Sequence, residues 1–255
     1  MDRRKKYVLV FDTETTPIRK DLGIVNTDNS LVYDFGCGVF DKKGNLYDYK
    51  SYVVRDVFIE LFNLMQSAYY VNKIPLYISD LANGTRLLKP IAEIKTEIAE
   101  LMEKWNITTI SAHNARFDIG VLENTMEYLT NGKEWRFFPN DRDIEVWDTL
   151  GMARDVVAKM ESYKAFCREH NQLTKNGRVK LTAESIYQYL TNDPNFVESH
   201  TGLEDVLIEG KILAYCMKQH KPMPRRTLTT LEKSIFPTEW TEENILTFFE
   251  KSIDI

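Results

Sequence analysis

The pattern of hydrophobic and polar positions divides the chain into a strand-rich beginning and a helix-rich remainder. Residues 7–11 are a continuous run of β-forming apolar side chains, which is typical of a central strand covered on both faces. Residues 31–40 and 46–54 predict a hairpin, because the turn-forming residues 41–45 lie between them. The chain therefore begins with three strands in antiparallel connection.

Helical spacing of apolar residues takes over after the hairpin. Residues 57–67 carry apolar side chains three and four positions apart, and residues 88–104 form a clear amphipathic pattern. Residues 68–85 contain Pro75 and Gly84 and give no clear prediction. We therefore expect a helical insertion over about residues 57–105.

Strands and helices then alternate. Residues 108–112 and 144–147 predict two short strands, with a helix over 115–130 between them. Further helices are predicted over about 182–190 and 203–219. Five strands with helices between the later ones indicate an α/β fold with a mixed five-stranded sheet flanked by helices.

The last helix ends at two prolines, Pro222 and Pro224. The pattern thus predicts one domain over residues 1–221 and a short helical C-terminal extension over residues 222–255. The 255 residues are enough to bury a substantial core.

The composition narrows the function classes. The net charge of −5, from 33 Lys and Arg against 38 Asp and Glu, excludes a strongly basic nucleic-acid coat. Phosphate binding would need local basic patches or metal ions. The chain has no apolar run long enough to span a membrane and no signal-peptide core, so we expect a cytoplasmic location. Three widely spaced cysteines predict neither a disulfide framework nor a zinc site.

Two carboxylates follow the first strand, in the sequence Phe-Asp-Thr-Glu-Thr. Asp12 and Glu14 are two positions apart, so they share one face of an extended chain. Two anions at the end of a buried strand repel each other, and hard divalent cations choose oxygen ligands. The pair indicates either a metal site or a solvated strand end.

Two further acids occur at predicted helix starts. Asp118 lies in the first turn after Asn114, where it could simply complement the helix dipole. Asp205 follows Thr201 and Glu204, which predict a capping box that fixes the start of the helix. Asp205 shares its side of the helix with isoleucines, so it is expected to be buried and to need a partner.

These motifs, in this order, resemble the DEDD superfamily of 3′→5′ exonucleases, which has the ribonuclease-H-like fold. The resemblance covers about residues 7–219. His200, five residues before Asp205, stands where another branch has Tyr and is similar to the DEDDh branch. That branch includes the proofreading subunit of bacterial DNA polymerase III and ribonuclease T, and similar stand-alone proteins are common in bacteriophages.

The resemblance implies a site and a reaction. His200 would be the general base, with a natural pKa near neutrality. Two Mg²⁺ or Mn²⁺ ions would clamp the attacking and leaving oxygens of a phosphodiester. The four implied metal ligands are Asp12, Glu14, Asp118 and Asp205. The implied substrate contacts are Thr13, Thr15 and Asn114.

The resemblance implies release of nucleoside monophosphates from 3′ ends of single-stranded nucleic acid, with DNA slightly preferred. An RNA 3′-trimming exoribonuclease is the close alternative. Another is a proofreading or binding subunit that docks on a polymerase or replication partner through residues 227–255.

Several assignments remain open at the level of sequence. His113 to Asp118 fits the usual third-motif spelling better than His200 to Asp205, but chain order makes it the second motif. Gly202 departs from the usual Ala, which is expected to matter little for the chemistry. Phe117 is expected in the helix core and Asp148 in a structural role. The basic turn at residues 175–180 is either a phosphate contact or a solvated loop.

Overall fold

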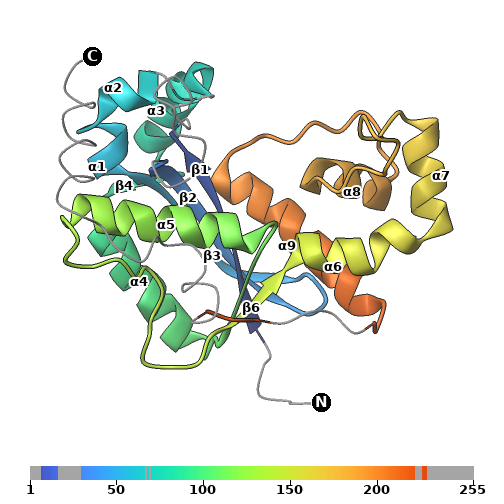
Figure 1. The fold of residues 1–255 in the computed structure, drawn as a ribbon. Coiled ribbons are helices and arrows are strands. Elements are labelled where there is room, and N and C mark those ends of the chain that lie inside the picture. The colour runs from blue at the N-terminus through green and yellow to red at the C-terminus, as the bar shows by residue number, and fades with distance from the viewer. Residues whose placement is uncertain (1–6, 17–29, 67, 69, 222–225, 229–255) are drawn as a thin grey trace.

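The computed structural model describes residues 7–16, 30–66, 68, 70–221 and 226–228 (Figure 1). Within these residues one sheet has seven strands, in the order β4-β3-β2-β1-β5-β6-β7. The strands are β1 (Tyr7–Thr15), β2 (Val32–Asp41), β3 (Leu46–Val54), β4 (Leu87–Lys89), β5 (Thr109–Ala112), β6 (Glu145–Asp148) and β7 (Arg226–Thr227).

The sheet is mixed. β1 pairs antiparallel with β2, and β2 pairs antiparallel with β3, as the predicted hairpin requires. On its other side β1 pairs parallel with β5, and β5 pairs parallel with β6. The α/β architecture with a mixed sheet is confirmed, and the five predicted strands are the centre of the sheet.

The predicted number of five strands was too small, because two short strands extend the edges. β4 pairs parallel with β3, and β7 pairs antiparallel with β6. With three and two residues, these strands are too short to show an alternating pattern. Only the neighbouring strand makes them part of the sheet.

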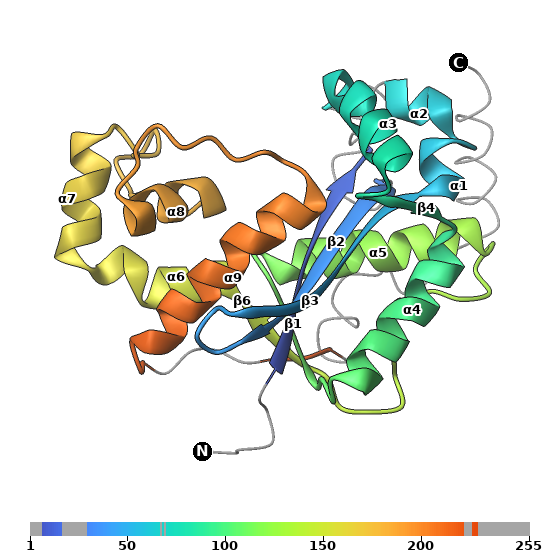
Figure 2. The same ribbon diagram turned by 180° about the vertical axis from the view of Figure 1, so that it is seen from behind.

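Helices cover both faces of the sheet. Figures 1 and 2 show α5 (Ala115–Leu129) and α9 (Gly202–Lys218) on opposite faces. The alternation along β1 explains this arrangement, since Leu9 and Phe11 join the core formed with α5 and α4 (Ile91–Lys104). Val8 and Val10 point the other way, into a second core formed with α9.

Three more helices pack on the α9 side of the molecule (Figure 2). Side chains from each of them join the second core together with α9. These helices are α6 (Thr149–Asp155), α7 (Glu161–Glu169) and α8 (Ala183–Thr191), with a short 3-10 turn, η4 (Val157–Lys159), after α6.

The described residues of the segment expected as a helical insertion form helices joined by turns, together with β4. The single helix predicted over 57–67 is two short helices separated at residues 59–61, where the sequence has neither Gly nor Pro. The pieces before β4 are α1 (Arg55–Phe58), α2 (Phe62–Gln66), η3 (Val71–Lys73) and α3 (Ile74–Asn83). This segment lies beside the ends of β1 and β2 (Figures 1 and 2).

The first described residues of the expected helical extension form a strand instead. β7 returns the chain to the edge of the sheet, and the backbone N–H of Leu228 donates to the carbonyl of Ile144 at 2.9 Å. Residues 229–255 lie outside the described residues. No described helix is both long and apolar enough to cross a bilayer.

Candidate active site

The first motif lies within β1, which extends further than the apolar run predicted. Asp12 and Glu14 share the strand face of Val8 and Val10, so they point toward α9. Thr13 points to the other face, and its hydroxyl donates to Oδ1 of Asp118 at 2.8 Å. The threonine predicted as a substrate contact therefore uses its hydroxyl to hold the second motif against β1.

The second motif opens α5. Asp118 is 3% exposed and sits in the first turn of the helix. Asn114 is the N-cap residue of the helix, but its side chain makes no capping bond. Its backbone has φ 75°, and its N–H donates to Oδ1 of Asp148 at 3.0 Å. Asp148 thus has the structural role that the sequence predicted.

The third motif starts α9 at the predicted place. Asp205 is 4% exposed, as its apolar helix side indicated. One of its oxygens accepts from the Thr201 backbone N–H at 3.1 Å, and the other from the Ser199 hydroxyl at 3.2 Å. Two residues of the loop before α9 therefore hold its carboxylate in place.

The predicted capping box has a different hydrogen-bond pattern. The Thr201 hydroxyl does not accept from the helix backbone but donates to the Glu204 carboxylate at 2.7 Å. The Gly202 N–H donates instead to Asp34, on β2, at 2.9 Å. The cap of this helix comes from the sheet, which local sequence spacing cannot show.

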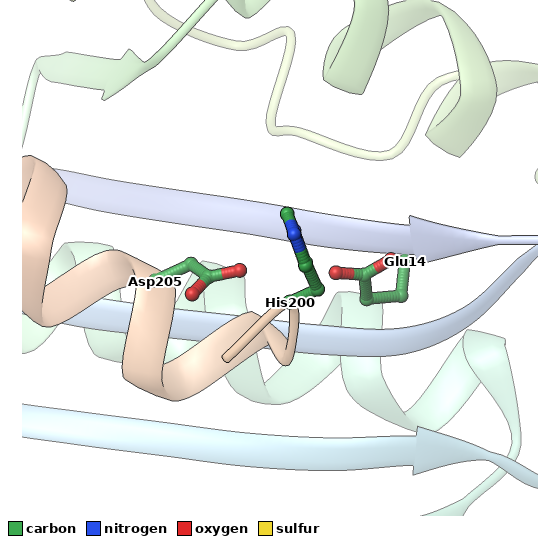
Figure 3. A group of neighbouring side chains, drawn as sticks. All are labelled: Glu14, His200 and Asp205. Carbon is green, nitrogen blue, oxygen red and sulfur yellow. The ribbon is translucent and has the colours of Figure 1, made fainter. Parts of the chain in front are cut away.

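Ligand atoms of Glu14, His200 and Asp205 all lie within 4.8 Å of one another (Figure 3). Asp12 and Asp118 belong to the same environment, because the negative charges of Asp118, Asp205 and Glu14 each raise the pKa of Asp12. The fold thus brings together all four acids and the histidine that the three motifs supplied.

The carboxylates of this group are costly to ionise. Burial raises the pKa of Glu14 to about 9, helped by the charges of Asp34 and Asp205. Burial also raises the pKa of Asp205 to about 8 and that of Asp118 to about 7. Burial is the main cause for Asp12 as well, whose pKa lies well above its usual range. A bound cation would offset both the desolvation and the mutual repulsion.

A fifth acid, Glu209, joins the group and was missed by the sequence reasoning. It lies one turn after Asp205 on α9 and is 2% exposed. Its Oε1 accepts from the His113 backbone N–H at 3.0 Å, which ties α9 to the second-motif loop. Its position four residues after Asp205 could have predicted it, because residues i and i+4 lie on the same side of a helix. We call Asp12, Glu14, Asp118, Asp205 and Glu209 the acid cluster.

His200 lies beside the acid cluster on the loop before α9. Its backbone is left-handed, with φ 50°, and its side chain is 40% exposed. The ring stacks on Tyr70 with centroids 4.7 Å apart and an angle of 17° between the planes. Its Nδ1 lies 3.9 Å from a carboxylate oxygen of Glu198.

Lys73, from η3, fixes the backbone of the same loop. Its Nζ donates to the carbonyl of His200 at 2.9 Å and also to the carbonyl of Ser199. The amine lies 4.0 Å from the centroid of the Tyr70 ring. Lys73 and Tyr70 were missed because they come from the stretch that gave no clear prediction, 126–130 positions away from the loop in sequence.

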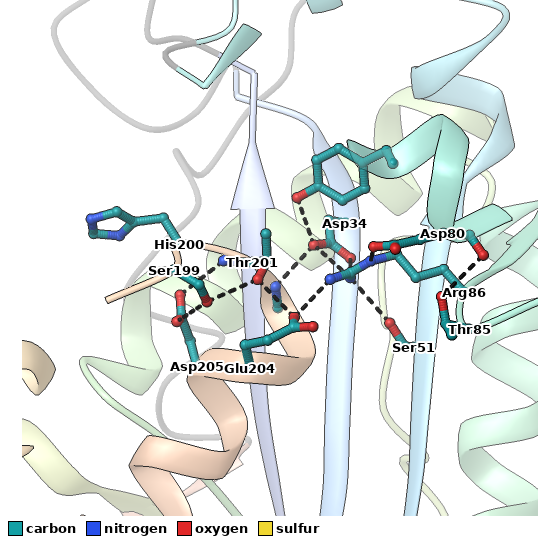
Figure 4. A network of polar contacts seen from close by, with 12 residues as sticks. Asp34, Ser51, Asp80, Thr85, Arg86, Ser199, His200, Thr201, Glu204 and Asp205 are labelled. Carbon is teal, nitrogen blue, oxygen red and sulfur yellow. Dashed lines mark hydrogen bonds and ion pairs between the residues drawn. The ribbon is translucent and has the colours of Figure 1, made fainter. Parts of the chain in front are cut away.

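A second acidic group lies on the other side of the start of α9 and is held by Arg86 (Figure 4). The guanidinium is buried and contacts Asp34 at 3.0 Å, Asp80 at 3.0 Å and Glu204 at 2.7 Å. Asp34 also accepts from the Tyr77 hydroxyl at 2.8 Å. We call these four charged residues, Arg86 with its three acids, the arginine network.

Two glycines bring β2 and the start of α9 into contact. A Cβ added at Gly202 would lie 2.7 Å from the backbone nitrogen of Gly36. One added at Gly36 would lie 2.2 Å from the carbonyl carbon of Gly202. The departure from Ala at position 202 therefore has a packing reason, which is the close approach of the β2 backbone.

The remaining predicted residues are placed as follows. Thr15 is half-buried, next to an irregularity in the β1–β2 register. Phe117 packs against the core, as expected. Lys175 and Arg178 lie on an exposed turn, and within the described residues no hydrogen bond or ion pair links that turn to the acid cluster. The three cysteines are buried free thiols.

No family model and no curated protein sequence matches the chain. Among solved structures, cell-death related nuclease 4 is similar in fold, with 15% identity, coverage of 86% of this chain and 66% of that chain, and a TM-score of 0.46. The zinc-bound E. coli exonuclease I–ssDNA complex has 13% identity, 90% and 42% coverage and a TM-score of 0.48. A product-bound exonuclease I structure has 13% identity, 90% and 46% coverage and a TM-score of 0.47. The chain spans less than half of either exonuclease I chain.

Proposed function

We propose that the protein is a metal-dependent 3′→5′ exonuclease. It would hydrolyse the terminal phosphodiester bond at the 3′ end of single-stranded nucleic acid and release nucleoside monophosphates, with DNA preferred slightly over RNA. The observation that carries the proposal is the meeting of four motif acids and His200 in one place, although they come from three distant parts of the chain.

The donor set fits hard divalent cations. The acid cluster offers several carboxylate oxygens and no thiol, which suits Mg²⁺ or Mn²⁺. Burial and mutual repulsion keep the pKa values of these acids high, so the group favours a cation that is not part of the protein. Asp12, Glu14, Asp118 and Asp205 would hold two ions. The ions would supply charge neutralisation at the phosphate that is being cleaved.

His200 would take the proton of the attacking water. Burial lowers the pKa of its imidazole, and the charge of Lys73 lowers it further, so the ring is neutral near pH 7 and can accept a proton. Its partial exposure lets a substrate reach it. Lys73 fixes the backbone of His200 by donating to its carbonyl.

The chain's other residues would place the substrate. Thr13 would act through Asp118, because its hydroxyl already donates to that carboxylate. Asn114, which is exposed at the second-motif loop, would contact the 3′-terminal nucleotide with its side chain. Thr15 lies next to Glu14 on β1 and would contact the same nucleotide.

The experiment is a paired degradation assay. Single-stranded DNA and RNA of one sequence, labelled at the 5′ end, are incubated with the full chain in Mg²⁺, in Mn²⁺ and in EDTA. We expect a ladder that shortens from the 3′ end with metal and no cleavage with EDTA. Asp12→Asn, which keeps the side-chain volume, is the matched control and should give no ladder.

Other outcomes would change the proposal. A labelled mononucleotide released at the start would mean 5′→3′ polarity. Faster cleavage of RNA would favour the 3′-trimming exoribonuclease. No cleavage of either polymer in any metal would overturn the proposal. A polymerase partner at residues 227–255 is not proposed, since residues 229–255 lie outside the described structure.

A further inference from the structure

Glu209 has a feature that the motif residues do not explain. Its side chain is 2% exposed, yet Oε2 has no hydrogen-bond partner among the described residues. A buried carboxylate oxygen without a donor costs free energy and is rare. The proposed reaction gives this residue no task, because the four motif acids complete the expected ligand set.

The position of Glu209 points to the acid cluster. On α9 it lies one turn beyond Asp205, on the same side of the helix. Its Oε1 is fixed by the His113 N–H, five residues before Asp118. Its charge is felt by Asp12, on the strand between these two motifs. Glu209 therefore lies among all three motifs, with one oxygen anchored and the other available.

We propose that Glu209 contributes its free Oε2 to divalent-cation binding by the acid cluster, as a fifth carboxylate. This inference rests on the metal centre of the proposed function. The Oε1 bond to His113 would keep the side chain in one orientation, so that binding a cation costs little side-chain entropy. The same bond would couple the cation to the second-motif loop.

The test is cation binding by the full chain without nucleic acid. Mn²⁺ is titrated into EDTA-treated, desalted protein in a calorimeter, and thermal unfolding is followed with and without Mn²⁺. Glu209→Gln keeps an oxygen that can accept from His113 and removes the charge. We expect its Kd for Mn²⁺ to rise by about 10–100-fold. Its metal-free Tm should not fall, because Oε2 has no hydrogen-bond partner in the described part of the chain.

Glu204→Gln is the matched control. It removes one negative charge from the same helix, but the Glu204 carboxylate pairs with Arg86 instead of facing the acid cluster. Its Kd for Mn²⁺ should stay within about twofold of the wild-type value, because the Glu204 charge is half-exposed and already paired with Arg86. An equal loss of affinity in both variants would show a general charge effect and would overturn the inference.

Glu209→Asp gives a second variant if the Gln form does not fold. It keeps the charge and withdraws the carboxylate by one methylene, so its affinity should fall between wild type and Glu209→Gln. Wild-type affinity in either folded variant would overturn the inference. If the wild type binds Mn²⁺ and these variants bind as well, only this inference fails. If the wild type binds no Mn²⁺, the metal centre of the proposed function fails too.

Discussion

Two groups of acids flank the start of α9, and they differ in what neutralises them. The arginine network holds Asp34 against a buried guanidinium, a tyrosine hydroxyl and a helix N–H. The acid cluster has no buried guanidinium among its described contacts, and the nearby amine of Lys73 donates to backbone carbonyls. The charge of Asp34 is compensated by a cation of the protein itself, whereas acids gathered without a cationic partner are suited to an external cation.

The largest expected effect separates activity from stability. Asp12→Ala and Asp205→Ala should abolish measurable hydrolysis through lost metal binding. The metal-free Asp12→Ala variant should be no less stable than the wild type, because the change removes an acid whose neighbours repel it. Nuclease assays and thermal unfolding in EDTA measure the two effects. A large fall in metal-free Tm would show that these acids stabilise the fold, as those of the arginine network do.

Replacing the base should slow the chemistry without weakening binding. His200→Ala should reduce the rate of hydrolysis by ~10²–10⁴-fold, the range for loss of a general base. The affinity for a 3′-ended oligonucleotide in Ca²⁺ should change little, because the ring is not among the four implied metal ligands. Single-turnover kinetics and fluorescence anisotropy measure the two quantities. Near-normal turnover would contradict the assignment of His200 as base.

Removing Arg86 should leave the acids of the arginine network without a buried positive charge. Arg86→Met should lower the free energy of unfolding by about 3–5 kcal/mol, since it leaves Asp34 buried without its cation. Adding Asp34→Asn should restore part of the loss. Denaturant unfolding of the single and double variants measures this coupling. Additive losses in the double variant would show that the pair is not coupled.

A smaller effect is expected where β2 meets α9, between the two groups. Gly202→Ala should cost about 1–3 kcal/mol, because the new Cβ would lie 2.7 Å from the Gly36 nitrogen and push the helix away. Asp205 belongs to the same helix and would move with it, so the Kd for Mn²⁺ should rise as well. Denaturant unfolding and calorimetry test both, and unchanged stability would show that the strand gives way easily.

The smallest effect is a pH dependence with an unusual sign. The pKa values of Asp118, Asp205 and Glu14 in the folded chain, about 7, 8 and 9, lie above the unfolded value of about 4. Between about pH 4 and about pH 9 the folded state binds more protons than the unfolded state, so the free energy of unfolding falls as pH rises.

In EDTA the Tm should therefore fall by several degrees between about pH 5.5 and about pH 8.5, at about 2–4 °C per kcal/mol. With Mn²⁺ the fall should become smaller, because the cation binds the deprotonated carboxylates. A Tm that rises with pH in EDTA would show that the acids are compensated inside the protein.

Sequence alone predicted what depends on local pattern. The apolar run of β1, the hairpin of β2 and β3, and the periodicity of α4 and α9 gave the main elements. The order of the three motifs gave four acids and His200, which the fold then brought together. These signals come from residues close together in sequence, whose apolar periodicity indicates a strand or a helix directly.

The tertiary structure decided which distant residues meet. It placed Lys73 against the His200 loop, aimed Glu209 at the second motif, and capped α9 with Asp34 instead of Thr201. It also showed why Gly202 and Gly36 are both glycines. These contacts join positions 96 to 168 residues apart. Such pairing follows from how the elements pack, which no local spacing encodes.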